Sequence, residues 1–149
     1  MSQTPPETLT GLPSYLITRI AHRYNQTTHA ELREIGLTTI STRILASLAI
    51  FGGLTINELC VHALAEQPTM SRALDRLEAD GFIKRTVKDD DNRKRVVKLT
   101  DTGEAMVPKI WPVMLSANES MLEGISAADR EVTLRTLLKV LENIRVHPI

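Results

Sequence analysis

Residues 82–99 constrain the fold most, because their pattern differs from that of the rest of the chain. Side chains alternate at period two through residues 82–88, and a second β-rich run covers residues 94–99. Between them, residues 89–93 read Asp-Asp-Asp-Asn-Arg, a composition typical of turns. The segment is therefore predicted to form a β-hairpin with a charged tip.

Elsewhere the apolar residues recur at helical spacing. The pattern predicts helices at residues 12–35 and 41–51, a short helix at 55–64, and a further helix from about Pro68 to Gly81. The inner face of this last helix would carry Met70, Ala73, Leu74 and Leu77, and its outer face Thr69, Arg72, Asp75, Arg76 and Asp80. After the hairpin it predicts a long helix and then a last helix that begins near Ser126. Only 3% of the residues are aromatic, so the core must be built mainly from Leu, Ile, Val, Met and Ala.

Short polar motifs mark the ends of several predicted helices. Thr55 and Glu58 fit a capping box, in which each side chain bonds the other residue's backbone amide. Pro68 suits the first turn of a helix, where its missing N–H costs nothing. Gly81 is expected as a left-handed C-cap, and Thr100 as the N-cap of the helix after the hairpin.

The order of these elements predicts a mainly α fold with a small β-hairpin. Residues 55–100 form a predicted helix-turn-helix followed by a hairpin wing. The major groove of a duplex admits one helix, whose exposed face contacts base edges while its apolar face holds it to the preceding helices. The hairpin can reach an adjacent minor groove, where negative potential is concentrated.

Charge is unevenly distributed along the chain. Eighteen basic and eighteen acidic residues give a formal net charge of zero, which argues against a uniformly basic surface. Residues 84–98, however, carry seven Lys or Arg and three Asp, a local charge of +4. A solvated hairpin that uses charge to prevent edge-to-edge aggregation explains this run equally well. The preceding helix-turn-helix favours DNA binding.

Two motifs at this spacing resemble a known family. The first is Glu66-Gln-Pro-Thr-Met-Ser-Arg-Ala-Leu-Asp-Arg-Leu-Glu-Ala-Asp-Gly-Phe-Ile-Lys-Arg85. The second is Asp91-Asn-Arg93 followed by Val97-Lys-Leu-Thr100. They resemble the recognition helix and the wing of MarR-family winged-helix regulators, closest to the SlyA-like members. The resemblance covers nearly the whole chain beyond the first eleven residues.

The resemblance implies roles for individual residues in DNA binding. Arg93 would enter the minor groove, Asp91 would orient it through a charge-assisted hydrogen bond, and Arg76 would bind phosphate. The full implied set is Thr38, Ser41, Gln67, Pro68, Thr69, Ser71, Arg72, Arg76, Arg85, Asp91, Arg93, Lys94 and Arg95. Simple alternatives are a solvated helix face, pairing of Arg72 or Arg76 with nearby aspartates, and an ion pair at the hairpin tip without a DNA role.

One residue departs from the family pattern. Leu64 stands in the turn of the helix-turn-helix, where the family often has glycine. A left-handed turn would be strained with leucine, so we expect a turn that is built differently.

Family members commonly bind small phenolic or anionic effectors between the dimer helices and the DNA-binding lobe. The residues here that would line such a pocket are Tyr15, Arg19, His22, Arg43 and Trp111. Ordinary packing or surface positions explain each of them as well.

Other chemical readings are weaker. Cys60 is expected to be a buried structural cysteine rather than a redox sensor, because no Lys or Arg lies near it in sequence. His22 and His29 share a helix face but lack a completing ligand, so neither a metal nor a cofactor is expected. Cys60 and His62 cannot form a catalytic pair, because residues two apart on a helix diverge. No glycine-rich phosphate loop or nucleophile–base set is present, so an enzyme is not expected.

The expected organisation is a flexible arm at residues 1–11 and one domain at 12–149. Residues 12–35 and 101–149 would form dimerisation helices and residues 38–100 the DNA-binding lobe. Amphipathic helices beside so small a lobe would expose apolar stripes, which a two-fold homodimer would cover. The chain has no long apolar run or secretory signal and has a single cysteine, which favours a cytoplasmic protein without a membrane partner.

The sequence thus predicts a homodimeric transcriptional regulator, a repressor, that binds a pseudo-palindromic duplex and responds to a small effector. The alternative is a winged-helix adaptor that binds a ligand or a protein without specific DNA recognition.

Overall fold

A computed structural model describes residues 7–88 and 91–147, except the side chains of residues 88 and 91–94. The elements in chain order are η1 (Leu9–Gly11), α1 (Pro13–Glu34), α2 (Thr39–Phe51), α3 (Ile56–His62), α4 (Gln67–Ala79), β1 (Ile83–Lys88), β2 (Asp91–Leu99), α5 (Asp101–Met121) and α6 (Ala127–Ile144). This order confirms the predicted mainly α fold with a hairpin wing. Of the expected arm, residues 1–6 lie outside the described part, and η1 is a single 3-10 turn.

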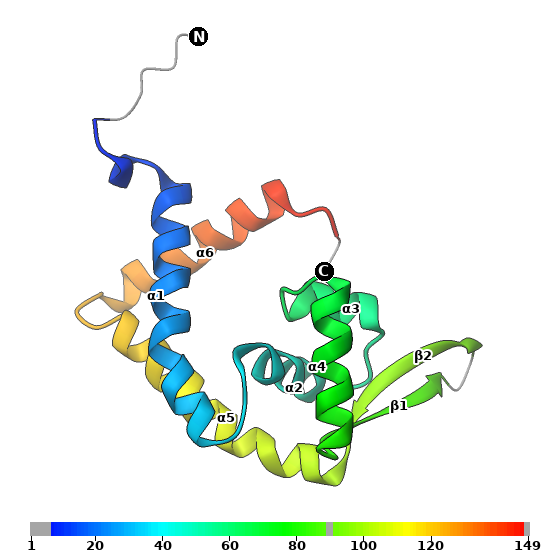
Figure 1. Ribbon diagram of the computed structural model, residues 1–149. Coiled ribbons are helices and arrows are strands. Elements are labelled where there is room, and N and C mark those ends of the chain that lie inside the picture. Colours follow the sequence, from blue (N-terminus) through cyan, green and yellow to red (C-terminus); the bar gives the residue numbers. More distant parts are fainter. Residues whose placement is uncertain (1–6, 89–90, 148–149) are drawn as a thin grey trace.

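Figure 1 shows two parts of the molecule. Helices α2, α3 and α4 cluster around one centre, and the hairpin of β1 and β2 projects from them. Helix α5 starts at the base of the hairpin and runs away from this lobe to pack along α1. Helix α6 then crosses behind α1 in this view.

The predicted helix caps are present. The Thr55 amide donates to Glu58 Oε2 at 2.7 Å, and the Glu58 amide donates to Thr55 Oγ1 at 3.3 Å, which completes the capping box. The side chain of Thr100 accepts from the Gly103 amide at 3.1 Å. Gly81 has a φ of 81°, the left-handed conformation expected after α4. These caps fix where the helices of the lobe begin and end.

The wing differs from its predicted boundaries. Strand β2 begins at Asp91, three residues before the expected start, because the antiparallel register shifts between Val87 and Lys88 and pairs Lys88 with Asp91. An isolated bridge joins Leu54 to Val97, with N···O distances of 3.1 and 2.7 Å. The base of the hairpin is therefore tied by backbone hydrogen bonds to the segment between α2 and α3.

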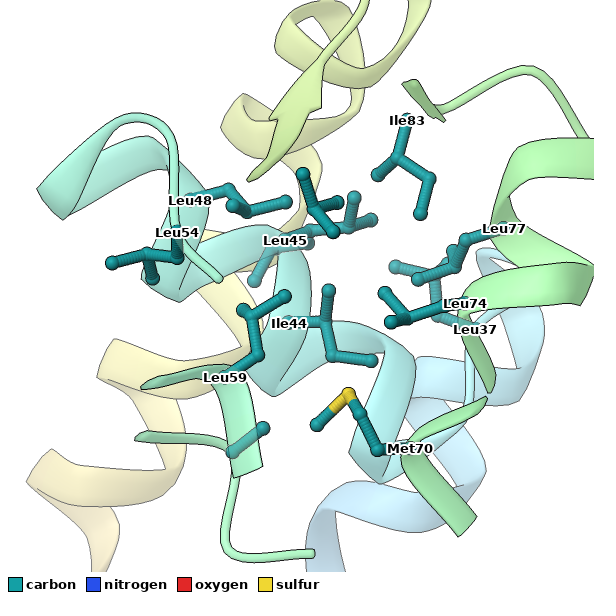
Figure 2. Packing of buried hydrophobic residues seen from close by; sticks show 13 residues of the cluster. Leu37, Ile44, Leu45, Leu48, Leu54, Leu59, Met70, Leu74, Leu77 and Ile83 are labelled. Carbon is teal, nitrogen blue, oxygen red and sulfur yellow. The ribbon is translucent and has the colours of Figure 1, made fainter. Parts of the chain in front are cut away.

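A single apolar cluster holds the lobe together. Ile44 and Leu45 of α2 are fully buried at its centre, as Figure 2 shows. The cluster continues through Leu37, Leu48, Leu54, Leu59, Ala63, Met70, Leu74, Leu77, Ile83, Val97 and Ile110. Met70, Leu74 and Leu77 confirm the predicted inner face of α4, whereas Ala73 is only half-buried. The opposite face of α4 is thereby directed to solvent.

The turn between α3 and α4 corrects a sequence-based expectation. Leu64 has a φ of 56° and is 73% exposed. The turn therefore adopts the left-handed conformation that glycine favours, with leucine in it, instead of a different construction. The Ala65 amide closes the turn by donating to the carbonyl of Cys60 at 3.0 Å. The strain is tolerated because the flanking helices are anchored in the core.

Leu64→Gly is expected to raise the free energy of unfolding by about 0.5–1 kcal/mol. Relief of left-handed strain gains roughly 1–2 kcal/mol, and the greater freedom of glycine in the unfolded chain offsets part of it. Leu64→Ala is the matched control, because alanine removes the exposed side chain but keeps the Cβ. Chemical denaturation checks both variants. Equal stability of the glycine and alanine variants would show that the turn stores no strain.

Large apolar side chains remain exposed on α1, α5 and α6. They include Leu16, Ile17, Ile20, Leu115, Met121, Val132, Leu134, Leu137, Leu138, Leu141 and Ile144. Within the described residues no single helix is long and apolar enough to cross a membrane, although α1 and α2, bent by 83°, meet the length and composition test as a pair.

Candidate nucleic-acid interface

Helix α4 presents a polar face beside the wing. Gln67, Pro68, Thr69, Ser71, Arg72 and Arg76 are all exposed. This exposure follows from helical periodicity, because Met70 and Leu74 lie on the opposite face of α4 and are fully buried. Gln67 Nε2 donates to Asn57 Oδ1 at 2.6 Å, which fixes the start of α4 against α3.

The two arginines of α4 differ in their surroundings. Arg76 Nε lies 3.9 Å from Asp80 Oδ2, and both side chains are at least half exposed. Such an exposed pair at the limit of contact contributes little and leaves Arg76 available to another partner. Arg72 makes no hydrogen bond or ion pair within the described part of the chain. Its guanidinium can therefore meet a ligand without first leaving a protein partner.

Arg85, one of the residues that the family resemblance implies in DNA binding, is paired within the protein. Its guanidinium bonds Asp75 at 2.6 Å and also bonds Glu78. Its backbone amide donates to Glu78 Oε1 at 3.1 Å. Partial burial by itself lowers the pKa of Arg85, but the bonds and charges of the two carboxylates together raise it above its ordinary value. Arg85 thus connects β1 to α4.

At the start of α2, Thr38 and Ser41, which the family resemblance implies in DNA binding, bond each other. Thr38 is exposed, but its Oγ1 accepts from the Ser41 amide at 3.2 Å and donates to Ser41 Oγ at 2.9 Å. Ser41 is only 5% exposed. Thr38 is therefore the N-cap of α2, and the Ser41 side chain is buried within the lobe.

The wing is described only in part. The side chains of Asp91, Arg93 and Lys94 lie outside the described residues, although their backbone belongs to β2. Arg95 is exposed, while Val96 and Val97 are buried. The basic residues Lys84 and Lys98 pair across the two strands and are both exposed. The hairpin therefore presents basic side chains to solvent along its described length.

Two acidic residues were missed as parts of this site. Asp75 and Glu78 stand three residues apart on α4, a spacing that places them on one helix face. The next strand contains a single arginine. Two carboxylates at this spacing followed by one arginine are the signal that would have suggested the pairing with Arg85. Asn57, the partner of Gln67, carries no such signal.

The five expected pocket residues do not surround one cavity. Arg19 lines a cavity of about 370 Å³ between α1 and α5, together with Arg23, Tyr24 and Met121. Arg43 lines another, of about 460 Å³, between the start of α2 and the turn before α4. Tyr15 accepts a hydrogen bond from Arg19 at 3.0 Å, His22 is exposed, and Trp111 is half-buried on α5.

Cys60 is half-buried instead of fully buried, and it packs against the core cluster. Burial raises the pKa of its thiol, and the negative charge of Glu66 raises it further. A raised pKa keeps the thiol protonated and unreactive at neutral pH. Within residues 7–88 and 91–147, no group of three His, Cys, Asp or Glu side chains is placed to hold a metal ion.

Comparison with known proteins agrees with this geometry. The sequence model of the MarR family matches residues 35–95, which include α2, α3, α4 and β1. A crystal structure of a MarR-family transcriptional regulator from Silicibacter pomeroyi is 43% identical, with a TM-score of 0.87 over 95% of this chain and 96% of that one. This chain belongs to the MarR family. It is a transcriptional regulator with a winged helix of the DNA-binding type.

Two further proteins resemble this chain. The HTH-type transcriptional repressor IacR of Pseudomonas putida is 26% identical over 132 residues, which cover 89% of this chain and 79% of that protein. The structure of S. aureus MepR in a complex with DNA shares the fold, with a TM-score of 0.80, 24% identity, and coverage of 93% of this chain and 100% of that one. The SlyA-like subtype suggested by the sequence stays a prediction.

Proposed function

We propose that this MarR-family regulator is a homodimeric repressor that binds a pseudo-palindromic operator through α4 and the wing. The observation that carries the proposal is the exposed face of α4, from Gln67 to Arg76, directly beside a basic hairpin. Its relative IacR is a transcriptional repressor, and MepR has been seen on DNA. The start of α4 carries neutral polar side chains and an arginine that has no partner among the described residues. This combination suits contacts to base edges and phosphates together.

The exposed apolar stripe supports the dimer. Side chains such as Leu16, Leu134, Leu138 and Leu141 are between 41% and 62% exposed on one copy. Covering them with the same surface of a second copy removes apolar area from water and creates a two-fold axis. In this arrangement residues 12–35 and 101–149 dimerise, and residues 38–100 form the DNA-binding lobe.

Selection of bound sites from random duplex DNA tests the proposal. We expect an inverted repeat whose half-sites are separated by about one DNA turn, roughly 10 base pairs. A chain that enriches no sequence while still folding and dimerising would instead be the winged-helix adaptor considered above.

The wing arginine has a predicted effect of its own. Arg93→Ala is expected to weaken binding to the selected duplex several-fold, and to lower the slope of log K against log salt by about one if the contact is phosphate-like. The same substitution at Arg135 of α6, whose side chain is 70% exposed, is the control. Anisotropy titrations at three or more matched salt concentrations measure both quantities. If the Arg93→Ala variant binds the duplex as tightly as wild type, the wing is not part of the interface.

A small effector is a second part of the proposal. The cavity between α1 and α5 combines the guanidinium groups of Arg19 and Arg23 with the apolar walls of Ile20 and Met121. This combination suits an aromatic carboxylate, whose charge would meet the arginines and whose ring would meet the apolar side chains. Occupation of this cavity would change the separation of the two lobes. Titration of 4-hydroxybenzoate into the operator complex tests it, with release of DNA as the expected result.

A further inference from the structure

The base of the wing is linked to α4 by one arginine and two carboxylates. Arg85 Nη2 donates to Asp75 Oδ1 at 2.6 Å, and Nη1 bonds Glu78 Oε2. The other oxygen of Glu78 accepts from the Arg85 amide at 3.1 Å. Glu78 is thus held by both the side chain and the backbone of the same β1 residue, which fixes the direction of the strand relative to the helix.

We infer that Arg85 is a positioning residue, which sets the angle of the wing to the recognition helix and does not itself contact DNA. The inference rests on the proposed function for its DNA readout. The Arg85 side chain is 24% exposed, in contrast to its exposed neighbour Lys84. For a phosphate contact the guanidinium would have to leave two carboxylates, both of which repel phosphate.

The position of Arg85 along the hairpin explains why this link matters. The hairpin is otherwise tied down at its base, where Ile83 is buried in the core and Val97 bridges to Leu54. Arg85 lies two residues further toward the tip than Ile83 and directly opposite Val97 in the register. At this level of the hairpin Val97 ties β2 to Leu54, and Arg85 ties β1 to α4. Because the hairpin projects from the lobe, a small change in the angle between β1 and α4 moves the residues at its tip by a larger distance, away from a groove.

The same link also changes the charge that α4 presents. Asp75 and Glu78 lie on the helix that is proposed to enter the major groove, and their side chains are 66% and 39% exposed. Unpaired, they would repel the phosphates on either side of the groove. Pairing with Arg85 reduces this repulsion without placing a cation on the DNA. One residue therefore both aims the wing and masks acidic groups of the recognition helix.

Two variants separate these effects in DNA binding. Arg85→Gln leaves the carboxylates unpaired, whereas Arg85→Gln with Glu78→Gln keeps the wild-type net charge but still lacks the link. We expect the double variant to bind the selected duplex roughly tenfold more weakly than wild type, with a salt slope equal to wild type. A phosphate contact would lower the slope by about 0.9. The Arg85→Lys variant should bind the duplex more tightly than Arg85→Gln but more weakly than wild type, because the single ammonium group of lysine cannot hold both carboxylates.

A readout without DNA tests the positioning role directly. Amide hydrogen exchange of the free protein is expected to become about tenfold faster in β1 and β2 of the Arg85→Gln variant, with α2 and α6 unchanged. Lys84→Gln is the matched control and should leave wing exchange as in wild type. The inference is overturned if amide exchange in the wing of the Arg85→Gln variant stays as in wild type. It is equally overturned if the salt slope of the double variant falls by about one, or if the Arg85→Lys variant binds the duplex as tightly as wild type. If wild type binds no specific duplex, the proposed function fails, and the exchange result still decides the role of Arg85.

Discussion

Arg72→Ala is expected to weaken binding to the operator by about 1–3 kcal/mol, or roughly 5- to 150-fold, and to relax the base preference at one position of each half-site. Arg72 lies in the second turn of α4 on its exposed face, and within the described residues no carboxylate competes for it. The buried side chains of Met70 and Leu74 on the opposite face hold the helix in place, so the substitution removes a contact without moving the scaffold. Anisotropy titration and a repeated site selection measure affinity and preference.

The control for this experiment is Arg135→Ala. Arg135 is 70% exposed on α6 and makes only a marginal pair with Glu131 at 3.9 Å, so the variant loses the same charge far from the proposed interface. Its affinity should stay within about twofold of wild type, because distant surface charges are screened by salt. If the Arg72→Ala and Arg135→Ala variants lose equal affinity for the operator, Arg72 acts through net charge alone.

The second large effect concerns stability. Gly103→Ala is expected to lower the free energy of unfolding by about 2–3 kcal/mol, and the melting temperature by roughly 5–10 °C. Gly103 is buried in the first turn of α5, where an added Cβ would overlap the carbonyl oxygen of Phe82 and lie 3.1 Å from Leu99 Cδ2. The obstacle is backbone at the start of the hairpin, which cannot rotate away. Thermal and chemical unfolding at matched protein concentration measure the loss.

Gly53→Ala is the matched control for Gly103. The nearest atoms to an added Cβ at Gly53 belong to the flexible Lys98 side chain, the closest at 3.0 Å. That chain can shift at little cost, and alanine also restricts the unfolded state. The Gly53→Ala variant should unfold within about 0.5 kcal/mol of wild type. A Gly103→Ala variant as stable as this control would show that the junction of wing and α5 is loosely packed.

Local signals in the sequence predicted much of the fold. The caps at Thr55, Thr100 and Gly81 act within a few residues, so their patterns located helix ends that the structure confirms. The apolar spacing of α4 likewise identified its buried face, because helical periodicity depends only on the helix itself. The same reasoning placed Arg72 and Arg76 on the exposed side, where the structure has them.

Features that depend on how elements meet were not predictable in this way. Strand β2 starts earlier than expected because its register is set by pairing with β1, which a single strand does not encode. Arg85 binds residues seven and ten positions before it, and that contact exists only once β1 folds back on α4. Leu64 keeps a left-handed turn because the anchored helices on both sides impose it. The proposed effector cavity likewise depends on how α1 packs on α5.

The affinity ratio between specific and unrelated duplexes tests the central claim most directly. Full-length protein is titrated by anisotropy, at about 150 mM salt, against its selected duplex and against a scrambled duplex of identical length and composition. The account predicts that the selected duplex binds at least roughly a thousandfold more tightly, with two protein chains per site. Equal affinity for the two duplexes, in protein that is folded and dimeric, would contradict it.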